Sequence, residues 1–182
     1  MLERVEFYKC PDGSINVKPF AGAMFAFDMS CRNIVEEMMV LIRDFYPGAF
    51  KALSELYSKS ERNRDYFEFR IVHRFIRCNF GEFDALSFDI GADGGFNVED
   101  VRCPLRGECL LEGVICKPQM QTKLTERESD VAVRLSKGMS KQDIAEDLSI
   151  SIYTVARHIA NIKLRMNFKH TYQIIAYFNG KS

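Results

Sequence analysis

The sequence has no long apolar run, no tryptophan and only 3 histidines. The apolar stretches among its 182 residues cover only a few positions, as in Met38 to Ile42. A helix needs about 20 apolar residues to span a bilayer. The first six residues, Met-Leu-Glu-Arg-Val-Glu, contain no basic segment leading into an apolar one, so no signal peptide is expected. We therefore expect a cytoplasmic protein with no membrane partner.

Low-complexity tracts and internal repeats are also absent from the sequence. Hydrophobic residues make up 47% and charged residues 27%, which is typical of a globular protein and not of a disordered one. A chain of this length accommodates one compact domain or two small ones.

The net charge of zero hides a difference between the two parts of the chain. In residues 1–118, acidic residues outnumber basic ones by 19 to 15, whereas residues 119–182 contain 10 basic and 6 acidic residues. Residues 151–182 contain basic residues and no acidic one. Such a block is typical either of a surface that binds a polyanion or of a solvated helix face.

Two hairpins and three helices are predicted in the amino-terminal part. The hairpins lie around turns rich in Gly and Asp, and the helices follow the 3.6-residue spacing of apolar side chains. In chain order these elements are a hairpin over 5–19, helices that begin near Ile34 and after Pro47, a helix over 67–76, and a hairpin over 86–98.

Four helices are predicted after Leu124. The first two begin with capping boxes, at Thr125 to Glu128 and at Ser140 to Asp143, in which two side chains satisfy two backbone amides. A third helix over 151–166 carries an apolar stripe at the helical period, and a fourth contains Tyr172 to Phe178.

Two capped helices joined by a short turn predict a helix-turn-helix. The side of the 151–166 helix that lies opposite its apolar stripe is predicted to carry no acidic residue. Its polar residues are Thr154, Arg157, His158, Asn161 and Arg165. A helix of this kind can enter the major groove and present Arg and Asn to base edges, while its amino end, capped by Ser151, attracts a phosphate.

Several of these motifs together resemble the LuxR-type (GerE-like) DNA-binding domain over roughly residues 122–180. The matching motifs are Leu124-Thr125-Glu126-Arg127-Glu128, Gly138-Met139-Ser140-Lys141, Ile144-Ala145, Leu148-Ser149-Ile150-Ser151, Thr154-Val155, His158-Ile159 and Asn161-Ile162. The resemblance implies a four-helix unit whose third helix reads the major groove of double-stranded DNA, commonly as a homodimer on paired half-sites. The contacts that it implies are Arg157, Ala160 and Asn161 to bases, and Lys141, Thr154 and His158 to the backbone.

Many members of this family carry a receiver or ligand-binding domain ahead of the DNA-binding domain. Residues 1–118 lack the strand–helix alternation of a receiver, and the absence of tryptophan disfavours an acyl-homoserine-lactone pocket. We therefore expect another kind of regulatory or interaction domain over 1–118, followed by the DNA-binding domain over 122–182. The predicted class is α+β, mostly α, with a small amino-terminal α+β domain that contains hairpins and a cysteine-rich segment.

Three of the 6 cysteines fall within 14 residues. Cys103, Cys109 and Cys116 have the spacing C-x5-C-x6-C, with a glycine in each interval. Either Cys78 or Cys10 could add a fourth thiol, and we select Cys78, at the end of a predicted helix. Four thiolates suit Zn²⁺ or an iron–sulfur cluster. The alternative is that no metal binds and the thiols are small buried side chains.

We expect a transcriptional regulator that binds DNA and is tuned by a metal or redox centre in its amino-terminal domain. A cysteine-dependent enzyme is not expected, because His73 is the only histidine before the carboxy-terminal part and no nucleophile motif is present. A third hypothesis is a metal-stapled module that binds another regulator and no DNA. The all-basic segment 151–182 argues against it.

Overall fold

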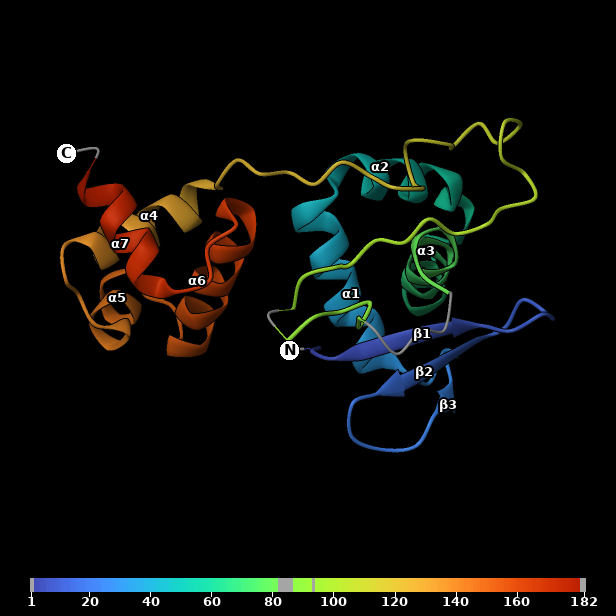
Figure 1. Ribbon diagram of the computed structural model, residues 1–182, viewed down its shortest axis with the longest axis horizontal. Coiled ribbons are helices and arrows are strands. Elements are labelled where there is room, and N and C mark those ends of the chain that lie inside the picture. Colours follow the sequence, from blue (N-terminus) through green and yellow to red (C-terminus); the bar gives the residue numbers. More distant parts are fainter. Residues whose placement is uncertain (1, 82–86, 93, 181–182) are drawn as a thin grey trace. The chain divides into compact units, whose positions relative to one another are not determined.

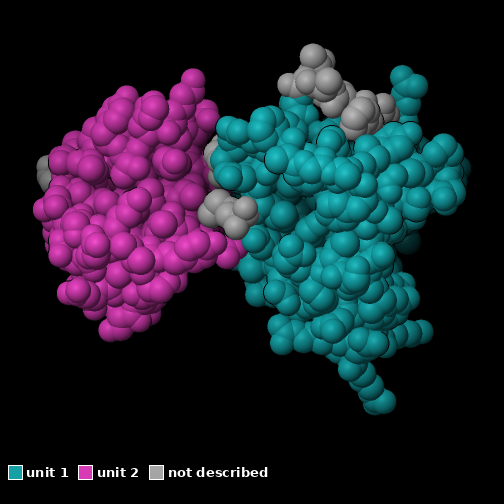
Figure 2. All heavy atoms as spheres, turned by 90° about the horizontal axis from the view of Figure 1, so that it is seen from below, with its two compact units in different colours: residues 1–121 teal, residues 122–182 magenta. Residues whose placement is uncertain are grey.

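The computed structural model describes residues 2–81, 87–92 and 94–180 of the chain. Two compact units divide it, Met1–Gln121 and Thr122–Ser182, which Figure 2 shows in separate colours. The first unit combines a small sheet with helices, and the second is helical (Figure 1). Among the described residues, no helix has the length and apolar character needed to cross a bilayer.

The sheet of the first unit confirms the predicted amino-terminal hairpin. Strands β1 (Val5–Lys9) and β2 (Ile15–Pro19) pair in antiparallel register, with Phe7 opposite Val17. A third strand, β3 (Phe25–Ala26), pairs with β2 and was not predicted, because two residues are too few to show an alternating pattern.

The three predicted helices of the first unit are confirmed. They are α1 (Arg32–Phe45), α2 (Pro47–Leu56) and α3 (Arg64–Asn79), with a short 3₁₀ turn, η1 (Ser58–Ser60), before α3. Proline occupies the first position of α2, where its missing N–H costs no hydrogen bond. The same residue therefore ends one helix and begins the next.

Aromatic rings form the centre of the first unit. The ring of Phe80, after α3, lies 5.8 Å from that of Phe7 in β1 and 5.5 Å from that of Phe96. Phe96 also lies 5.6 Å from Phe75 of α3 and stacks on Tyr46 at 5.7 Å. Burial in this cluster raises the pKa of Tyr46 to about 12. The cluster therefore joins the sheet to α3 and to the segment that follows it.

The second predicted hairpin, over 86–98, is reduced to isolated bridges. Ile90 pairs with Phe96 and also with Val5 of β1, so this segment extends the edge of the first hairpin instead of forming strands of its own. Leu86 and Asp93, which were part of the prediction, lie outside the described residues.

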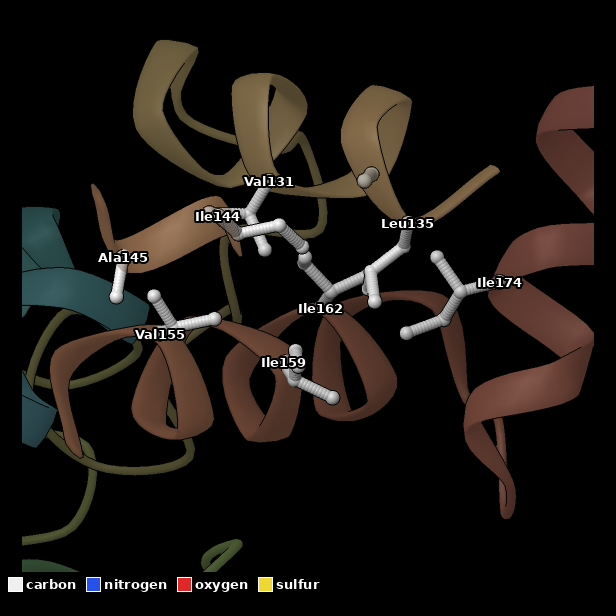
Figure 3. Packing of buried hydrophobic residues seen from close by; sticks show 9 residues of the cluster. Val131, Leu135, Ile144, Ala145, Val155, Ile159, Ile162 and Ile174 are labelled. Carbon is white, nitrogen blue, oxygen red and sulfur yellow. The ribbon is translucent and has the colours of Figure 1, made fainter. Parts of the chain in front are cut away.

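All four helices predicted in the second unit are present. They are α4 (Glu126–Ser136), α5 (Lys141–Asp147), α6 (Ile152–Met166) and α7 (Thr171–Asn179). Both predicted capping boxes form, at Thr125 and at Ser140. Side chains from all four helices meet in one core (Figure 3). The buried members of that core are Val131, Ala132, Leu135, Ile144, Ala145, Val155, Ile159, Ile162 and Ile174.

We expect Gly81→Ala to destabilise the first unit by about 1–3 kcal/mol. Gly81 has φ of +134°, and a Cβ added there would lie 2.9 Å from the Cβ of Lys9 in β1. Urea denaturation measures the change. Gly48→Ala is the matched control, because nothing lies within 4 Å of its added Cβ in α2, and it should be neutral or stabilising. Equal stability of the two variants would contradict the prediction.

Candidate nucleic-acid interface and cysteine cavity

The turn between α5 and α6 positions the candidate recognition helix. Ser149 adopts the left-handed conformation at φ 53°, and the amide of Ile150 donates to the carbonyl of Ala145 at 2.9 Å. The Oγ of Ser151 then accepts from the amide of Thr154 at 3.0 Å and caps α6. The chain thus reverses within a few residues, and the amino end of α6 keeps free backbone donors at the surface.

Most of the residues predicted to contact DNA are accessible in this structure. Lys141 and Ser151 are exposed, and the half-buried ones are Thr154, Arg157, His158 and Ala160. Sequence reasoning missed Tyr153, whose side chain is 65% exposed. It lies four residues before Arg157 and seven before Ala160, and this spacing places the three on one stripe of α6.

Arg165 does not lie on the open face of α6, where it was predicted. Its side chain is fully buried, and its Nε lies 2.9 Å from Oε2 and 3.1 Å from Oε1 of Glu128 in α4. Arg165 follows Ile162 by three residues and therefore lies at the flank of the apolar stripe, within reach of α4. A buried charge requires a partner, and Glu128 supplies it.

Asn161 is the second residue that the structure moves from the predicted open face. Only 6% of it is exposed. It directly precedes Ile162 of the core and therefore lies at the margin of the apolar stripe instead of opposite it.

The sequence of the second unit matches a family of known proteins. Residues 122–178 match the GerE family, described as bacterial regulatory proteins of the luxR family. This segment is a luxR-type domain. The match includes both capping boxes and the whole of α6.

Known proteins with a similar sequence include the response regulator protein VraR of Staphylococcus aureus, from strains Mu3 and COL. Each is 30% identical over 86 residues, which is 42% of this chain and 41% of the relative. The chain therefore spans about two fifths of the length of these relatives. No solved structure matches the chain.

A second candidate site lies in the first unit, away from the luxR-type domain in sequence. All four cysteines of the predicted metal site, Cys78, Cys103, Cys109 and Cys116, line one cavity of about 30 Å³. Cys10, the alternative fourth ligand, instead accepts a hydrogen bond from Asn16 in the hairpin. The structure thus brings together the four selected thiols from α3 and from the segment after it.

Asn79 holds this segment against the end of α3. Its Nδ2 donates to the carbonyl of Ile115 at 2.9 Å, and its Oδ1 accepts from the amide of Lys117 at 2.9 Å. Because Asn79 is fully buried and follows Cys78, these bonds fix Cys78 next to Cys116. Nothing in the sequence pattern indicated this role for Asn79, since the two segments are 36 residues apart.

The electrostatics of the cavity do not favour a cysteine nucleophile. Burial raises the pKa of the Cys78 thiol to about 11, with Arg74 opposing the shift and Cys116 and Cys103 adding to it. A thiol with this pKa is protonated at neutral pH and reacts slowly.

Three carboxylates form a further group that sequence reasoning missed. In the part of the chain that the structure describes, only Glu6, Asp89 and Glu99 bring three or more ligand atoms within 4.8 Å of one another. Asp89 accepts a hydrogen bond from the amide of Phe7 at 2.6 Å and so supports β1. The three residues are too far apart in sequence for a motif to reveal them.

We expect Arg165→Met to destabilise the luxR-type domain by about 3–5 kcal/mol, because the Glu128 carboxylate would stay buried without its charged partner. Thermal or urea unfolding of the full chain measures the loss. The control Lys163→Met removes a cation from the neighbouring part of α6 and should have little effect. Adding Glu128→Gln to Arg165→Met should recover part of the loss, since Gln can complete the capping box without a charge. A double variant that is no more stable than Arg165→Met would contradict the ion-pair explanation.

Proposed function

We propose that this protein is a transcriptional regulator that binds specific sequences of double-stranded DNA with α6 in the major groove. The observation that carries the proposal is a luxR-type domain in which α6, the second helix of the α5–α6 helix-turn-helix, presents an accessible face and contains no acidic residue. Its action on DNA places it in the cytoplasm of a bacterial cell. No catalytic activity is part of the proposal.

The proposed contacts follow the stripe of α6 and its amino end. Arg157 reaches a base edge, where its fork of donors suits guanine, and Ala160 packs against a base such as the thymine methyl group. Lys141, Thr154 and His158 contact phosphates, as does the amino end of α6 near Ser151. Asn161 and Arg165 are left out of this set because both are buried.

We expect Arg157→Ala to weaken binding to a specific site by about 1–3 kcal/mol and to reduce discrimination between sequences. The probe is a short duplex that the full chain selects from a random-sequence pool, and fluorescence anisotropy measures affinity. Lys141→Ala should weaken selected and scrambled duplexes alike and reduce the salt slope by about 1.

The control for these variants is Lys51→Ala, which removes an exposed cation from α2 of the first unit. If neither Arg157→Ala nor Lys141→Ala differs from this control, α6 is not the recognition helix. The full chain should bind a duplex with an affinity that falls as salt rises. If no such binding is measured, the alternative hypothesis, a module that binds another regulator and no DNA, explains the protein better.

We further propose that the protein binds DNA as a homodimer and that α7 forms the contact between the two copies. A single DNA-binding module buries too little surface for tight specific binding, so two copies on paired half-sites are expected. Tyr172 and Tyr177 of α7 are 65% and 39% exposed, and their rings supply apolar surface for a second copy.

We expect Tyr172→Glu to convert the dimeric DNA complex into a weaker, monomeric one, because it places a charge in the proposed contact. The mass of the complex and the length of its footprint measure this change. Leu110→Glu, at a residue 98% exposed in the first unit, is the control. A parent complex with one chain on one short, unpaired footprint would rule out the dimer.

The first unit is proposed to be the part of the protein that tunes DNA binding. Its support is the convergence of four thiols on one cavity, a feature that the luxR-type domain does not need for its own fold.

A further inference from the structure

We propose that Cys78, Cys103, Cys109 and Cys116 are the ligands of one metal centre and that the ion bound there is Zn²⁺. The proposal concerns the first unit alone. It does not depend on DNA binding by the luxR-type domain, because its tests measure metal content and thermal stability.

The cysteine segment buries few apolar side chains of its own. From Arg102 to Val114, only Cys103, Cys109 and Leu111 are even half-buried, and the other residues are exposed. Leu110 is 98% exposed, and the nearest buried apolar side chains, Val101 and Ile115, lie at the two ends of this stretch. A segment that buries so little apolar surface needs another source of stability, and metal–thiolate bonds supply folding energy directly.

The four thiols also line one cavity. Two of the three half-buried residues in that stretch are cysteines, and both line the same cavity as Cys78 and Cys116. The four thiols thus reach one cavity from two separate segments of the chain. The cavity of about 30 Å³ has room for about one ion or water molecule, which favours a single ion over a cluster of several iron and sulfide atoms.

Two of the four proposed ligands, Cys78 and Cys116, are already held close together. The bonds of Asn79 to Ile115 and Lys117 hold the backbone at Cys78 next to the backbone at Cys116, and both thiols line the cavity. Two ligands are therefore in place before an ion arrives, which reduces the conformational entropy that binding must overcome.

The other two ligands lie on a turn that can approach this pair. Zn–S bonds of about 2.3 Å place the sulfur atoms of a tetrahedral site about 3.8 Å apart. In the described residues, no three of the four thiols lie within 4.8 Å of one another. Binding therefore draws Cys103 and Cys109 inward. Gly107, between them, adopts φ of +88°, and nothing lies within 4 Å of a Cβ added there.

The charge around the cavity fits a thiolate centre. Four thiolates and one Zn²⁺ carry a net charge of about −2. Arg77 lines the cavity, and the guanidinium of Arg74 lies close enough to interact with Cys78 and Cys109. Within the described part of the chain, the buried Nε of Arg74 has no hydrogen-bond partner. A metal-bound thiolate is a stronger acceptor than a thiol and would supply one.

The test is metal analysis of the full chain, purified without oxygen and without added metal, together with its melting temperature. We expect about one zinc per chain in the parent protein and in the control, Cys31→Ser. In the parent, the Cys31 thiol lies outside the cavity and donates a hydrogen bond to the Ala26 carbonyl. Cys109→Ser should lose the zinc and melt several degrees lower. Cobalt(II) added to the metal-free parent should give thiolate charge-transfer absorption that Cys109→Ser lacks.

A chelator separates metal binding from simple packing. It should lower the melting temperature of the parent to that of Cys109→Ser and leave the variant unchanged. If Cys109→Ser melts below the parent by the same margin with and without chelator, the thiol is a core residue and the proposal is overturned. Iron with inorganic sulfide in place of zinc would overturn the choice of ion, and a parent without metal would overturn the site. Loss of zinc from Cys31→Ser would overturn the ligand assignment.

Discussion

The buried carboxylate of Glu128 is the contact on which the architecture of the luxR-type domain depends. Its Oε2 accepts from the amide of Thr125 at 2.8 Å and completes the cap of α4. The same carboxylate pairs with Arg165 near the end of α6. One side chain therefore fixes where α4 begins and how α6 lies against it. Because both charges are removed from water, the pair tolerates little displacement, and this restricts the position of the recognition helix.

The ion pair also changes which charges are available to DNA. Arg165 belongs to the basic block by sequence, but in the structure it neutralises Glu128 and contributes nothing to the surface. The accessible cations of α6 are Arg157 and Lys163, and Lys141 lies at the start of α5. In the proposed DNA complex, Lys141 and the helix dipoles attract phosphates at the amino ends of α5 and α6.

The first unit is stabilised in two different ways along its length. Up to Phe96, aromatic rings from the sheet and the helices pack against one another and bury the usual apolar core. From Arg102 to Val114 no residue is buried, and the chain is held at the ends of this stretch by Val101 and Ile115 and by polar contacts with the end of α3, above all those of Asn79. The four thiols lie at this boundary, where hydrophobic burial gives way to directional bonding.

Local signals in the sequence determined most of the secondary structure. The capping boxes at Thr125 and Ser140 and the proline at residue 47 act within a few residues of themselves, so their effects could be predicted without knowledge of the fold. The helix-turn-helix was predicted from the caps and the short turn between them, and the grouping of Cys103, Cys109 and Cys116 from their spacing. Cys78 was chosen over Cys10 because it ends a predicted helix. The short strand β3 and the isolated bridges of Ile90 were not, because their pairing depends on partners far along the chain.

The tertiary structure decided the fate of individual charged and polar side chains. Helical periodicity places Arg165 at the edge of the apolar stripe, where either water or a partner can satisfy it, and only the packing of α4 against α6 brings Glu128 within reach. The same holds for Asn79, whose hydrogen bonds join segments 36 residues apart. Periodicity along one helix determines which face is apolar. Whether a group at the margin of that face meets solvent or an opposite charge depends on a neighbouring element, which the local sequence does not encode.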